Sequence, residues 1–151
     1  MNPFPIPKNI LENIFLQSER EYPGECCGMI LGPANRPGVL SRLRPCRNVQ
    51  DEYHDKDPQN FPRTSRTAYF IDPKELLAIQ KEARHLNEEI RVIYHSHTDA
   101  GAYFSDEDAR IALVESEPAY PGVVYLVVSV QQGRKKEANL FSWNPKERRF
   151  K

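Results

Sequence analysis

The residues of this chain that can do chemistry together are two histidines, an aspartate, a serine and an upstream glutamate. His95 and His97 end an apolar stretch that is typical of a buried strand, and Asp108 follows eleven residues after the second histidine. Alternate residues of a strand face the same way, so both imidazoles can reach one metal ion, with Asp108 returning as a third ligand. Three protein ligands leave one tetrahedral position open for water, which is typical of catalytic zinc. Glu25 and Ser105 are residue types that can serve as general base and oxyanion donor.

The spacing of these residues resembles the signature of a known family. The pattern consists of His95-Ser96-His97, then Ser105 and Asp108, together with the upstream segment Glu25-Cys26-Cys27-Gly28. It resembles the JAMM (MPN-plus, Mov34/PAD-1-like) zinc metallopeptidases, and most of all their small bacterial and archaeal single-domain members. The likeness covers nearly the whole chain. Thr98 stands where the family usually has a proline that binds no metal, so this change concerns loop geometry and leaves the ligand set intact.

The resemblance implies a fold and an activity. The fold would be a single-domain α-β-α sandwich with a mixed, curved sheet over residues 1–151, of the type that MPN domains share with cytidine deaminases. One Zn²⁺ per chain would be held by His95, His97 and Asp108, and would activate a water molecule. Glu25 would take the proton of that water and deliver it to the leaving amine, while Ser105 and the metal stabilise the oxyanion. The expected reaction is amide hydrolysis at the C-terminal Gly-Gly of a ubiquitin-like or sulfur-carrier protein.

Substrate binding can be anticipated only in outline. A thin diglycine tail can lie as an added strand beside an exposed sheet edge. The polar segment Arg47–Thr67 contains prolines, shows no period and is expected to be a long loop, which in compact domains is usually functional or mobile. This loop could clamp the partner, with Arg63 and Arg66 contacting acidic groups on the carrier protein.

Other interpretations compete with this one. The chain could be a catalytically silent MPN scaffold, or another zinc hydrolase acting on a small molecule, although a cluster of several metals would need more histidines than His54 and His85. A cysteine nucleophile is disfavoured because Cys26 and Cys27 are adjacent on a strand and must face opposite ways, which suits buried packing. The Ser-x-x-Asp pattern at Ser105 is also a helix-capping arrangement, and a capped helix is a rigid mount for a ligand.

Bulk properties narrow the class of protein. A length of 151 residues fits one domain, and 21 basic against 21 acidic residues give no general electrostatic case for nucleic acid or an anionic membrane. The longest apolar run, Val123–Val128, is too short to span a bilayer. Met1–Pro5 lacks the features of a secretory signal, and three cysteines form no disulfide framework, so a cytoplasmic location is expected. An exposed sheet edge and apolar helix faces leave room for a homodimer.

Hydrophobic periodicity predicts the elements that must position the site. A helix is expected over Pro7–Glu21, and another begins at Asp72, which combines an N-cap aspartate with a proline at the first helical position. The histidines are expected on a strand over Ile90–His95, and Val123–Val130 is the most strand-like segment. Because helices and strands interleave irregularly, the pattern favours an α/β sandwich with a mixed sheet over a doubly wound parallel one.

Further elements complete this prediction. The expected strands are Cys27–Leu31, Val39–Pro45, Ala68–Ile71 and Glu137–Ser142, and a third helix is expected over Ser105–Glu115. The helix that starts at Asp72 is expected to end near Leu86 and to bury Leu76, Leu77, the stem of Gln80 and Ala83.

Overall fold

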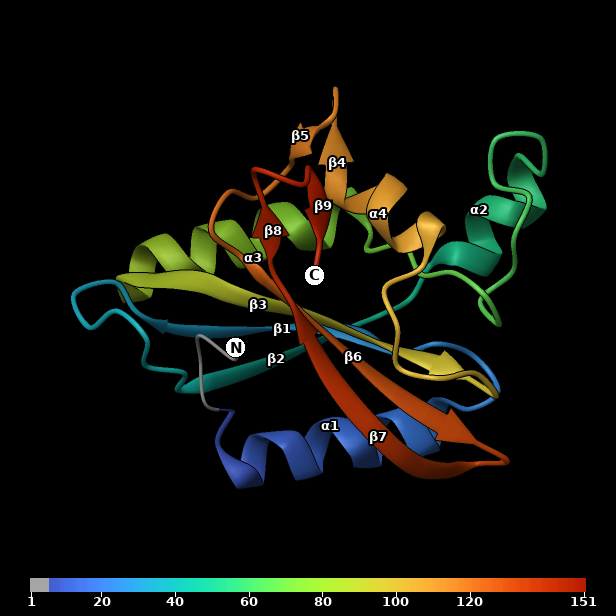
Figure 1. The fold of residues 1–151 in the computed structure, drawn as a ribbon, viewed down its shortest axis with the longest axis horizontal. Coiled ribbons are helices and arrows are strands. Elements are labelled where there is room, and N and C mark those ends of the chain that lie inside the picture. The colour runs from blue at the N-terminus through green and yellow to red at the C-terminus, as the bar shows by residue number, and fades with distance from the viewer. Residues whose placement is uncertain (1–5) are drawn as a thin grey trace.

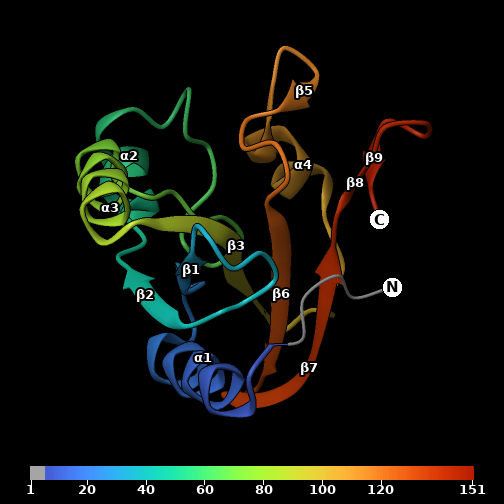
Figure 2. The same cartoon turned by 90° about the vertical axis from the view of Figure 1, so that its left-hand side faces the viewer.

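A five-stranded sheet in the order β2-β1-β3-β6-β7 carries the fold, and the computed structural model describes residues 6–151. Strands β3 and β6 are parallel, whereas all other neighbours in this sheet are antiparallel. Helix α1 covers one face, and α3 and α4 lie on the other, with α2 beyond α3 on that side (Figure 1). Figure 2 shows the twist of the strands between these layers. The predicted α-β-α sandwich with a mixed sheet is therefore confirmed.

The elements, in chain order, are α1 (Lys8–Glu21), β1 (Cys27–Pro33), β2 (Arg42–Cys46), α2 (Gln50–Lys56), α3 (Pro73–Leu86), β3 (Glu88–Thr98), α4 (Asp106–Ala112), β4 (Leu113–Val114), β5 (Glu117–Pro118), β6 (Val124–Gln131), β7 (Arg134–Phe141), β8 (Trp143–Asn144) and β9 (Arg149–Phe150). Strands β4 and β5 form a small hairpin, as do β8 and β9. None of the helices within residues 6–151 is long and apolar enough to cross a membrane. Met1–Pro5, on which the expectation about a secretory signal depended, lie outside the described residues.

Alternation along the strands produces a separate hydrophobic core on each face of the sheet. Cys27 and Met29 belong to the cluster that includes side chains of α3 and α4, whereas Cys26 and Ile30 belong to the cluster with Ile14 of α1. Successive strand residues point to opposite faces, which explains this division. Both cysteines are fully buried on opposite sides of the sheet, as the sequence predicts.

Helix α3 has the predicted caps but a different buried stripe. The Asp72 side chain accepts a hydrogen bond from the backbone N–H of Lys74, and Asn87 ends the helix in the left-handed conformation. The expectation that Leu77 is buried is wrong, because its side chain is 52% exposed. Ala83 is buried as predicted, together with Ile79 four residues before it, whereas Gln80, whose stem was expected to be buried, is exposed.

The prediction of one long loop over Arg47–Thr67 is wrong, because it contains helix α2. This helix has seven residues, too few for an apolar period to be visible in the sequence. Its position depends on distant partners: the ring of Tyr53 packs on Phe61 and Phe70, with centroids 5.0 and 4.9 Å away. Aromatic contacts of this kind stabilise the helix only after the chain has folded back.

The strand predicted over Ala68–Ile71 is also wrong, since only an isolated bridge joins Ile71 to Asn48. The side chain of Asn48 takes the place of a neighbouring strand. Its Oδ1 accepts from the N–H of Phe70 at 3.0 Å, and its Nδ2 donates to the carbonyl of Ala68 at 3.1 Å. The backbone groups of this segment are thereby satisfied without a ladder.

Several element boundaries differ from the prediction: β2 begins at Arg42 and not at Val39, and β3 spans Glu88–Thr98 and not Ile90–His95. Helix α4 ends at Ala112, not at Glu115, because Leu113–Val114 pair with Glu117–Pro118 as strands β4 and β5. The hairpin strand expected over Glu137–Ser142 begins earlier, at Arg134, directly after the turn.

A glycine at the centre of the sheet leaves room for the ring of Tyr94. Gly28 pairs with Tyr94 across β1 and β3, and a methyl group on Gly28 would lie 2.3 Å from the tyrosine hydroxyl oxygen. Tyr94 is fully buried and cannot move aside, since its hydroxyl donates to Gln17 of α1 at 2.5 Å. Gln17 in turn donates to the carbonyl of Cys27 at 3.1 Å. This chain of hydrogen bonds joins α1 to the sheet.

We therefore expect Gly28→Ala to lower the free energy of unfolding by about 1–3 kcal/mol through overpacking. The measurement is chemical denaturation of the two proteins under the same conditions. Gly101→Ala is the matched control, because a methyl group there meets only Glu137 at an ordinary 3.4 Å. Equal stability of the Gly28→Ala protein and the wild type would contradict this packing.

Candidate metal centre

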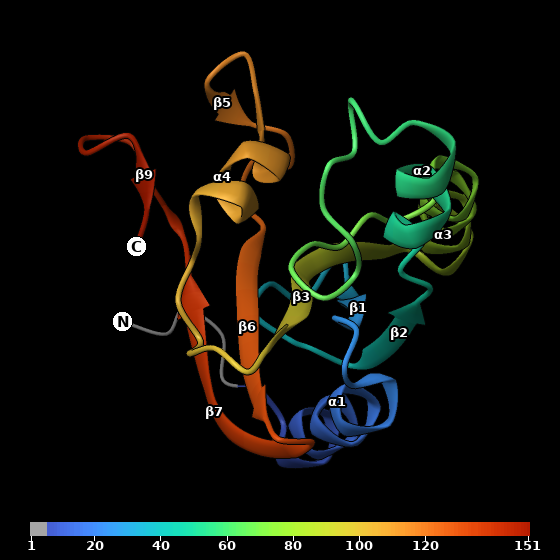
Figure 3. The same cartoon turned by 90° about the vertical axis from the view of Figure 1, so that its right-hand side faces the viewer.

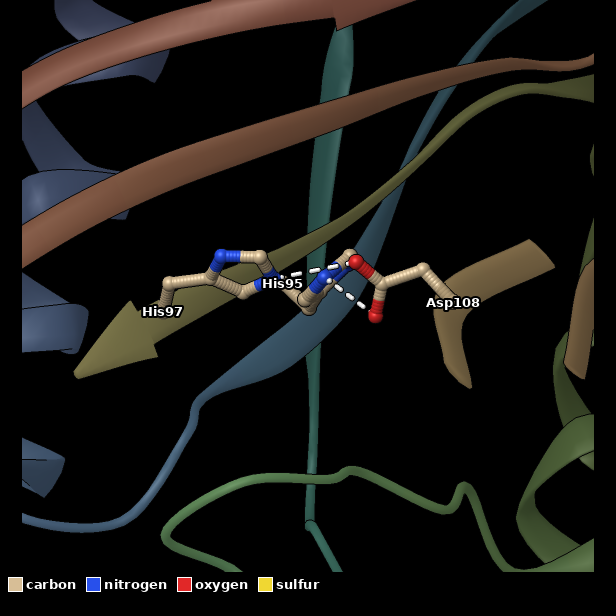
Figure 4. Close-up of side chains that lie close together, drawn as sticks. All are labelled: His95, His97 and Asp108. Atoms are coloured by element: carbon tan, nitrogen blue, oxygen red, sulfur yellow. Dashed lines mark hydrogen bonds and ion pairs between the residues drawn. The ribbon is translucent and has the colours of Figure 1, made fainter. Parts of the chain in front are cut away.

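Three side chains from two elements converge at the end of strand β3. His95 and His97 lie on β3, Asp108 lies on α4, and all three are buried. Nε2 of His95 is 3.0 Å from one carboxylate oxygen of Asp108, and Nε2 of His97 is 3.0 Å from the other. One donor atom from each residue lies within 4.8 Å of the others, and Figure 4 shows the rings and the carboxylate pointing toward one another. Within residues 6–151 this is the one such group of three or more histidine, cysteine or acidic side chains.

Asp108 is held in place by the cap of its own helix. Ser105 is the N-cap of α4: its Oγ accepts from the N–H of Asp108 at 3.0 Å, and its own N–H donates to Oδ2 of Asp108 at 2.9 Å. This reciprocal pair is a capping box, as the sequence pattern predicts. The same contacts fix the direction of the carboxylate and leave the hydroxyl hydrogen of Ser105 free to donate elsewhere.

The hydrogen bonds of the histidines suit a cation shared between them and Asp108. Nδ1 of His97 lies 2.8 Å from the carbonyl oxygen of Gly101, which requires its N–H there. A neutral ring then presents a lone pair to the carboxylate, so a proton or a metal ion must lie between the two. Within the described residues, neither ring nitrogen of the buried His95 has a hydrogen-bond partner, because its 3.0 Å contact with Asp108 lacks hydrogen-bond geometry. The donor set therefore fits a divalent metal ion.

The protonation states at this site favour metal binding. Burial would raise the pKa of Asp108, but the side chains of His95 and His97 and the N–H of Ser105 outweigh it, so that this pKa is lowered. Burial lowers the pKa of His95 against the opposing effect of Asp108. A carboxylate and a neutral imidazole are the forms that bind metal ions.

Glu25 lies in the cleft beside these ligands, just before strand β1. The cleft is lined by Glu25, Arg63, Arg66, Thr67, His97, Thr98, Ala100, Tyr103 and Ser105. Glu25 is only 4% exposed, and its Oε1 has no hydrogen-bond partner among residues 6–151. Burial raises its pKa well above the ordinary value, Asp108 raises it further, and Arg63 lowers it. Burial and the neighbouring Asp108 thus favour the protonated form of this carboxyl group more than water does.

The backbone around Glu25 is held on both sides. Its N–H donates to the carbonyl of Ser65 at 2.7 Å, and its carbonyl accepts from the side chain of Asn48 at 3.0 Å. The next residue, Cys26, donates its N–H to the buried hydroxyl of Ser96 at 2.7 Å. Because Ser96 lies between the two histidines, this contact sets Glu25 at a defined position relative to the metal ligands.

The cysteines are unsuited to nucleophilic catalysis. Burial raises the pKa of Cys26 to about 12, and burial likewise raises the pKa of Cys27 well above its usual value. Thiolates are the reactive form, so neither thiol is a nucleophile at neutral pH. His54 lies apart, with Nδ1 2.7 Å from the carbonyl oxygen of Phe61.

Two contributors to the site could not be recognised in the sequence. The ring of Tyr69 stacks on His95, with centroids 4.5 Å apart and planes 20° from parallel. The carbonyl of Gly101 orients His97. Neither residue belongs to the histidine pattern, although the turn at Asp99-Ala100-Gly101 indicated a reversal of the chain there.

Comparison with known proteins agrees with this geometry. The profile of the family described as prokaryotic homologs of the JAB domain matches residues 7–146. The chain belongs to this JAB-domain family. The predicted resemblance to JAMM proteins is thereby confirmed.

Named relatives of this JAB-domain chain include two peptidases. It is 27% identical over 132 residues to the CysO-cysteine peptidase of Mycobacterium tuberculosis, covering 87% of this chain and 77% of that protein. It is 28% identical over 107 residues to the desampylase of Haloferax volcanii, covering 71% and 63%.

Solved structures show the same fold. A protein from Desulfitobacterium hafniense superimposes with a TM-score of 0.67 at 23% identity, covering 92% of this chain and 83% of that one. A protein from Salinibacter ruber superimposes with a TM-score of 0.62 at 26% identity, covering 96% and 85%. The arrangement of the sheet and helices is therefore shared across distant sequences.

Thr98 gives this JAB-domain chain a contact that a proline could not make. Its hydroxyl donates to the carbonyl of Arg66 at 2.8 Å and so ties the Arg63–Thr67 loop to the end of β3. The threonine that departs from the usual family pattern therefore holds one wall of the cleft.

We expect Glu25→Gln to stabilise the metal-free protein at pH 8. Folding raises the pKa of Glu25, so the folded protein binds this proton more tightly than the unfolded chain, and stability falls as the pH rises from about 4.5 through the raised pKa. Glutamine removes this loss, so Tm should rise at pH 8, and the gain should vanish at pH 4. Thermal unfolding in the presence of a chelator measures both values.

Glu107→Gln is the matched control for this comparison. Its hydrogen bond with Arg110 lowers the pKa of Glu107, so the stability it contributes is present above about pH 4.5 and is lost on acidification. We expect this substitution to lower Tm at pH 8. A lower Tm for Glu25→Gln as well would show that the Glu25 carboxylate is not held at an energetic cost.

Loss of the Thr98 hydroxyl should loosen the loop. We expect Thr98→Val to speed trypsin cleavage after Arg63 and Arg66 about fivefold, since one hydrogen bond is worth about 1 kcal/mol and cleavage follows the open population. Thr98→Ser retains the hydroxyl and should be cut at the wild-type rate. Equal rates for the valine and serine variants would show that the contact does not restrain the loop.

Proposed function

We propose that this chain is a zinc-dependent peptidase or isopeptidase that cleaves an amide bond at the C-terminal Gly-Gly of a ubiquitin-like or sulfur-carrier protein. One observation carries the proposal: the donor atoms of His95, His97 and Asp108 converge beside a cleft in which the buried carboxyl of Glu25 has an unpaired oxygen. The family and the two peptidases among its relatives support the reaction class. We propose that residues 1–151 act as one domain.

The proposed roles follow from the contacts of each side chain. Neutral His95 and His97 and ionised Asp108 would hold one zinc ion through Nε2 of each ring and the carboxylate. When bound, the ion supplies a Lewis acid that polarises a carbonyl group and lowers the pKa of water from about 15.7 to about 7. The hydrogen bond of His97 to Gly101 fixes the tautomer that this binding requires.

Glu25 is proposed to move the proton. Its unpaired, buried carboxylate would accept a proton from the attacking water, and its raised pKa allows it to hold that proton until the leaving nitrogen takes it. Water thus supplies the new oxygen on the carbonyl carbon, the C–N bond breaks, and the amine leaves neutral. The fixed backbone of Glu25 keeps the carboxyl in place during both transfers.

Ser105 is proposed to donate to the oxygen of the reacting carbonyl. Its Oγ already accepts from Asp108, so its hydroxyl hydrogen is available toward the cleft that the residue lines. Removal of one oxyanion donor typically costs on the order of 3 kcal/mol of transition-state stabilisation.

The topology changes the expected path of the diglycine tail. The free edges of the sheet are β2 and β7, whereas β3, which carries the histidines, is an interior strand. A tail added to a sheet edge would therefore lie away from the metal ligands. We propose instead that the tail enters the cleft between the Arg63–Thr67 loop and the segment of Tyr103 and Ser105.

Zinc content and turnover of Glu25→Gln test the function. We expect this variant to bind one zinc ion per chain and to lose turnover of a carrier-protein adduct by about 100- to 10,000-fold, the usual contribution of general acid–base catalysis. Glu107→Gln, a glutamate of α4 paired with Arg110, should keep both properties. A silent scaffold would show no turnover to lose. Unchanged hydrolysis by Glu25→Gln would refute the mechanism.

A further inference from the structure

The segment that leads from β3 to α4 is bound along its length to the hairpin of β6 and β7. Asp99 donates its N–H to the carbonyl of Val130 at 2.7 Å, and its side chain accepts from the N–H of Gln132 at 2.8 Å. The carbonyl of Ala100 accepts from the hydroxyl of Ser129 at 2.5 Å. In Figure 3 the segment crosses β6 and then rises beside β7 to α4. The chain is therefore held from the first residue after β3 onward.

One peptide group of this segment connects the candidate metal centre to the edge strand β7. Its carbonyl, that of Gly101, lies 2.8 Å from Nδ1 of His97. Its N–H, that of Ala102, donates to Oε1 of Glu137 at 3.1 Å. Because the peptide group is planar and trans, its carbonyl and its N–H point in opposite directions. His97 and Glu137 therefore bind the two ends of one rigid unit, which we call the 101–102 peptide group.

The neighbouring peptide groups are held as well. On one side, Ser129 binds the carbonyl of Ala100. On the other, Nδ2 of Asn139 donates to the carbonyl of Ala102 at 2.9 Å. Asn139 lies two positions after Glu137, so the two side chains share one face of β7. The 101–102 peptide group therefore cannot rotate without breaking contacts on both sides of it.

A metal-binding imidazole depends on the group that accepts its other N–H. That acceptor fixes the orientation and the tautomer of the ring, and it raises the basicity of the nitrogen that binds the metal. A peptide carbonyl accepts more strongly when the N–H of the same peptide group donates to another acceptor, because successive hydrogen bonds polarise one another. Glu137 therefore both holds the 101–102 peptide group toward His97 and strengthens it as an acceptor.

We propose that Glu137 acts on His97 through the 101–102 peptide group and is a positioning residue of the metal centre. The inference rests on the proposed function in one respect, that His97 is a zinc ligand. Glu137 is not among the residues that line the cleft, so its contribution is to metal binding and not to contact with the substrate. Its side chain is exposed, and truncating it leaves no buried cavity.

Zinc affinity is the first test, measured by competition with a chromophoric chelator. We expect Glu137→Ala to weaken zinc binding about tenfold, the lower end of the usual effect of removing a partner that orients a metal ligand, since one peptide group intervenes. Glu137→Gln retains an oxygen that can accept from the N–H and should keep most of the affinity. Arg134→Ala removes an exposed side chain at the start of β7, and this matched control should bind zinc as the wild type does.

The second readout is the Nδ1 proton of His97, followed by NMR in the zinc-loaded protein with labelled histidine. Exchange of this proton with water requires its contact with Gly101 to open, so the rate follows the open population. We expect exchange to be about fivefold faster in Glu137→Ala, which is the effect of one hydrogen bond of ordinary strength. The rate in Glu137→Gln should stay close to that of the wild type.

The outcomes separate this inference from the proposed function. A Glu137→Ala protein that is less stable but keeps its zinc affinity and its His97 exchange rate would show that Glu137 is merely structural, and would overturn the inference alone. Equal losses in Glu137→Gln and Glu137→Ala would assign the effect to negative charge near the site, not to the contact with the peptide group, and would overturn it as well. A wild-type protein that binds no zinc would refute the proposed function and this inference with it.

Discussion

A buried carboxylate that faces two imidazole nitrogens at 3.0 Å is the constraint on which the rest of this structure depends. With its Nδ1–H given to Gly101, the His97 ring offers Asp108 a lone pair unless a cation lies between them. His95 has no hydrogen-bond partner among the described residues for either ring nitrogen. Groups of this kind are costly to bury without compensation, and a divalent ion compensates for all three at once.

The fold meets this constraint with elements that cannot shift independently. β3 is an interior strand paired on both sides, so the two histidines point in one fixed direction. Asp108 is held by the cap of α4, where one serine satisfies a helix end and orients a ligand through the same pair of hydrogen bonds. Glu25 is fixed through the contact of Cys26 with Ser96, the residue between the histidines. His95, His97, Asp108 and Glu25 are thus held by one connected set of strand pairing and hydrogen bonds.

The loop that forms one wall of the cleft is held in a different way from the candidate metal centre. This loop is joined to the rest of the protein by side-chain contacts from α2 and from Thr98, so it can hold charged groups at the surface without burying them. Arg66 lies 3.7 Å from Asp99, whereas among residues 6–151 no carboxylate lies within 4.0 Å of Arg63, although the two arginines are only three positions apart. The charged side chains of this loop therefore line an open cleft, whereas the carboxyl groups of Glu25 and Asp108 are buried beside the histidines.

Local patterns in the sequence determined the candidate metal-binding residues and most of the fold. Strand alternation places His95 and His97 on one face and separates Cys26 from Cys27, and the Ser105 pattern predicts the capping box, because each depends on residues close together in the chain. Patterns of this range also predict α1, α3 and the main strands. The same patterns predicted the element boundaries and the buried helix faces less accurately. Leu77, for example, was expected to be buried but is exposed.

Only the tertiary structure decided the features that depend on contacts between distant segments. Tyr53 of helix α2 packs on Phe61 and Phe70, and the side chain of Asn48 hydrogen-bonds the segment at Ala68–Ile71 where local composition predicts a strand. The burial of Glu25 and its raised pKa arise from the loop packed over it, although a glutamate in this sequence context would usually be exposed. The pKa of a group, and whether its charge has a partner, depend on every neighbour around it in the folded protein. Because many of these neighbours come from distant parts of the chain, residue spacing in the sequence does not reveal them.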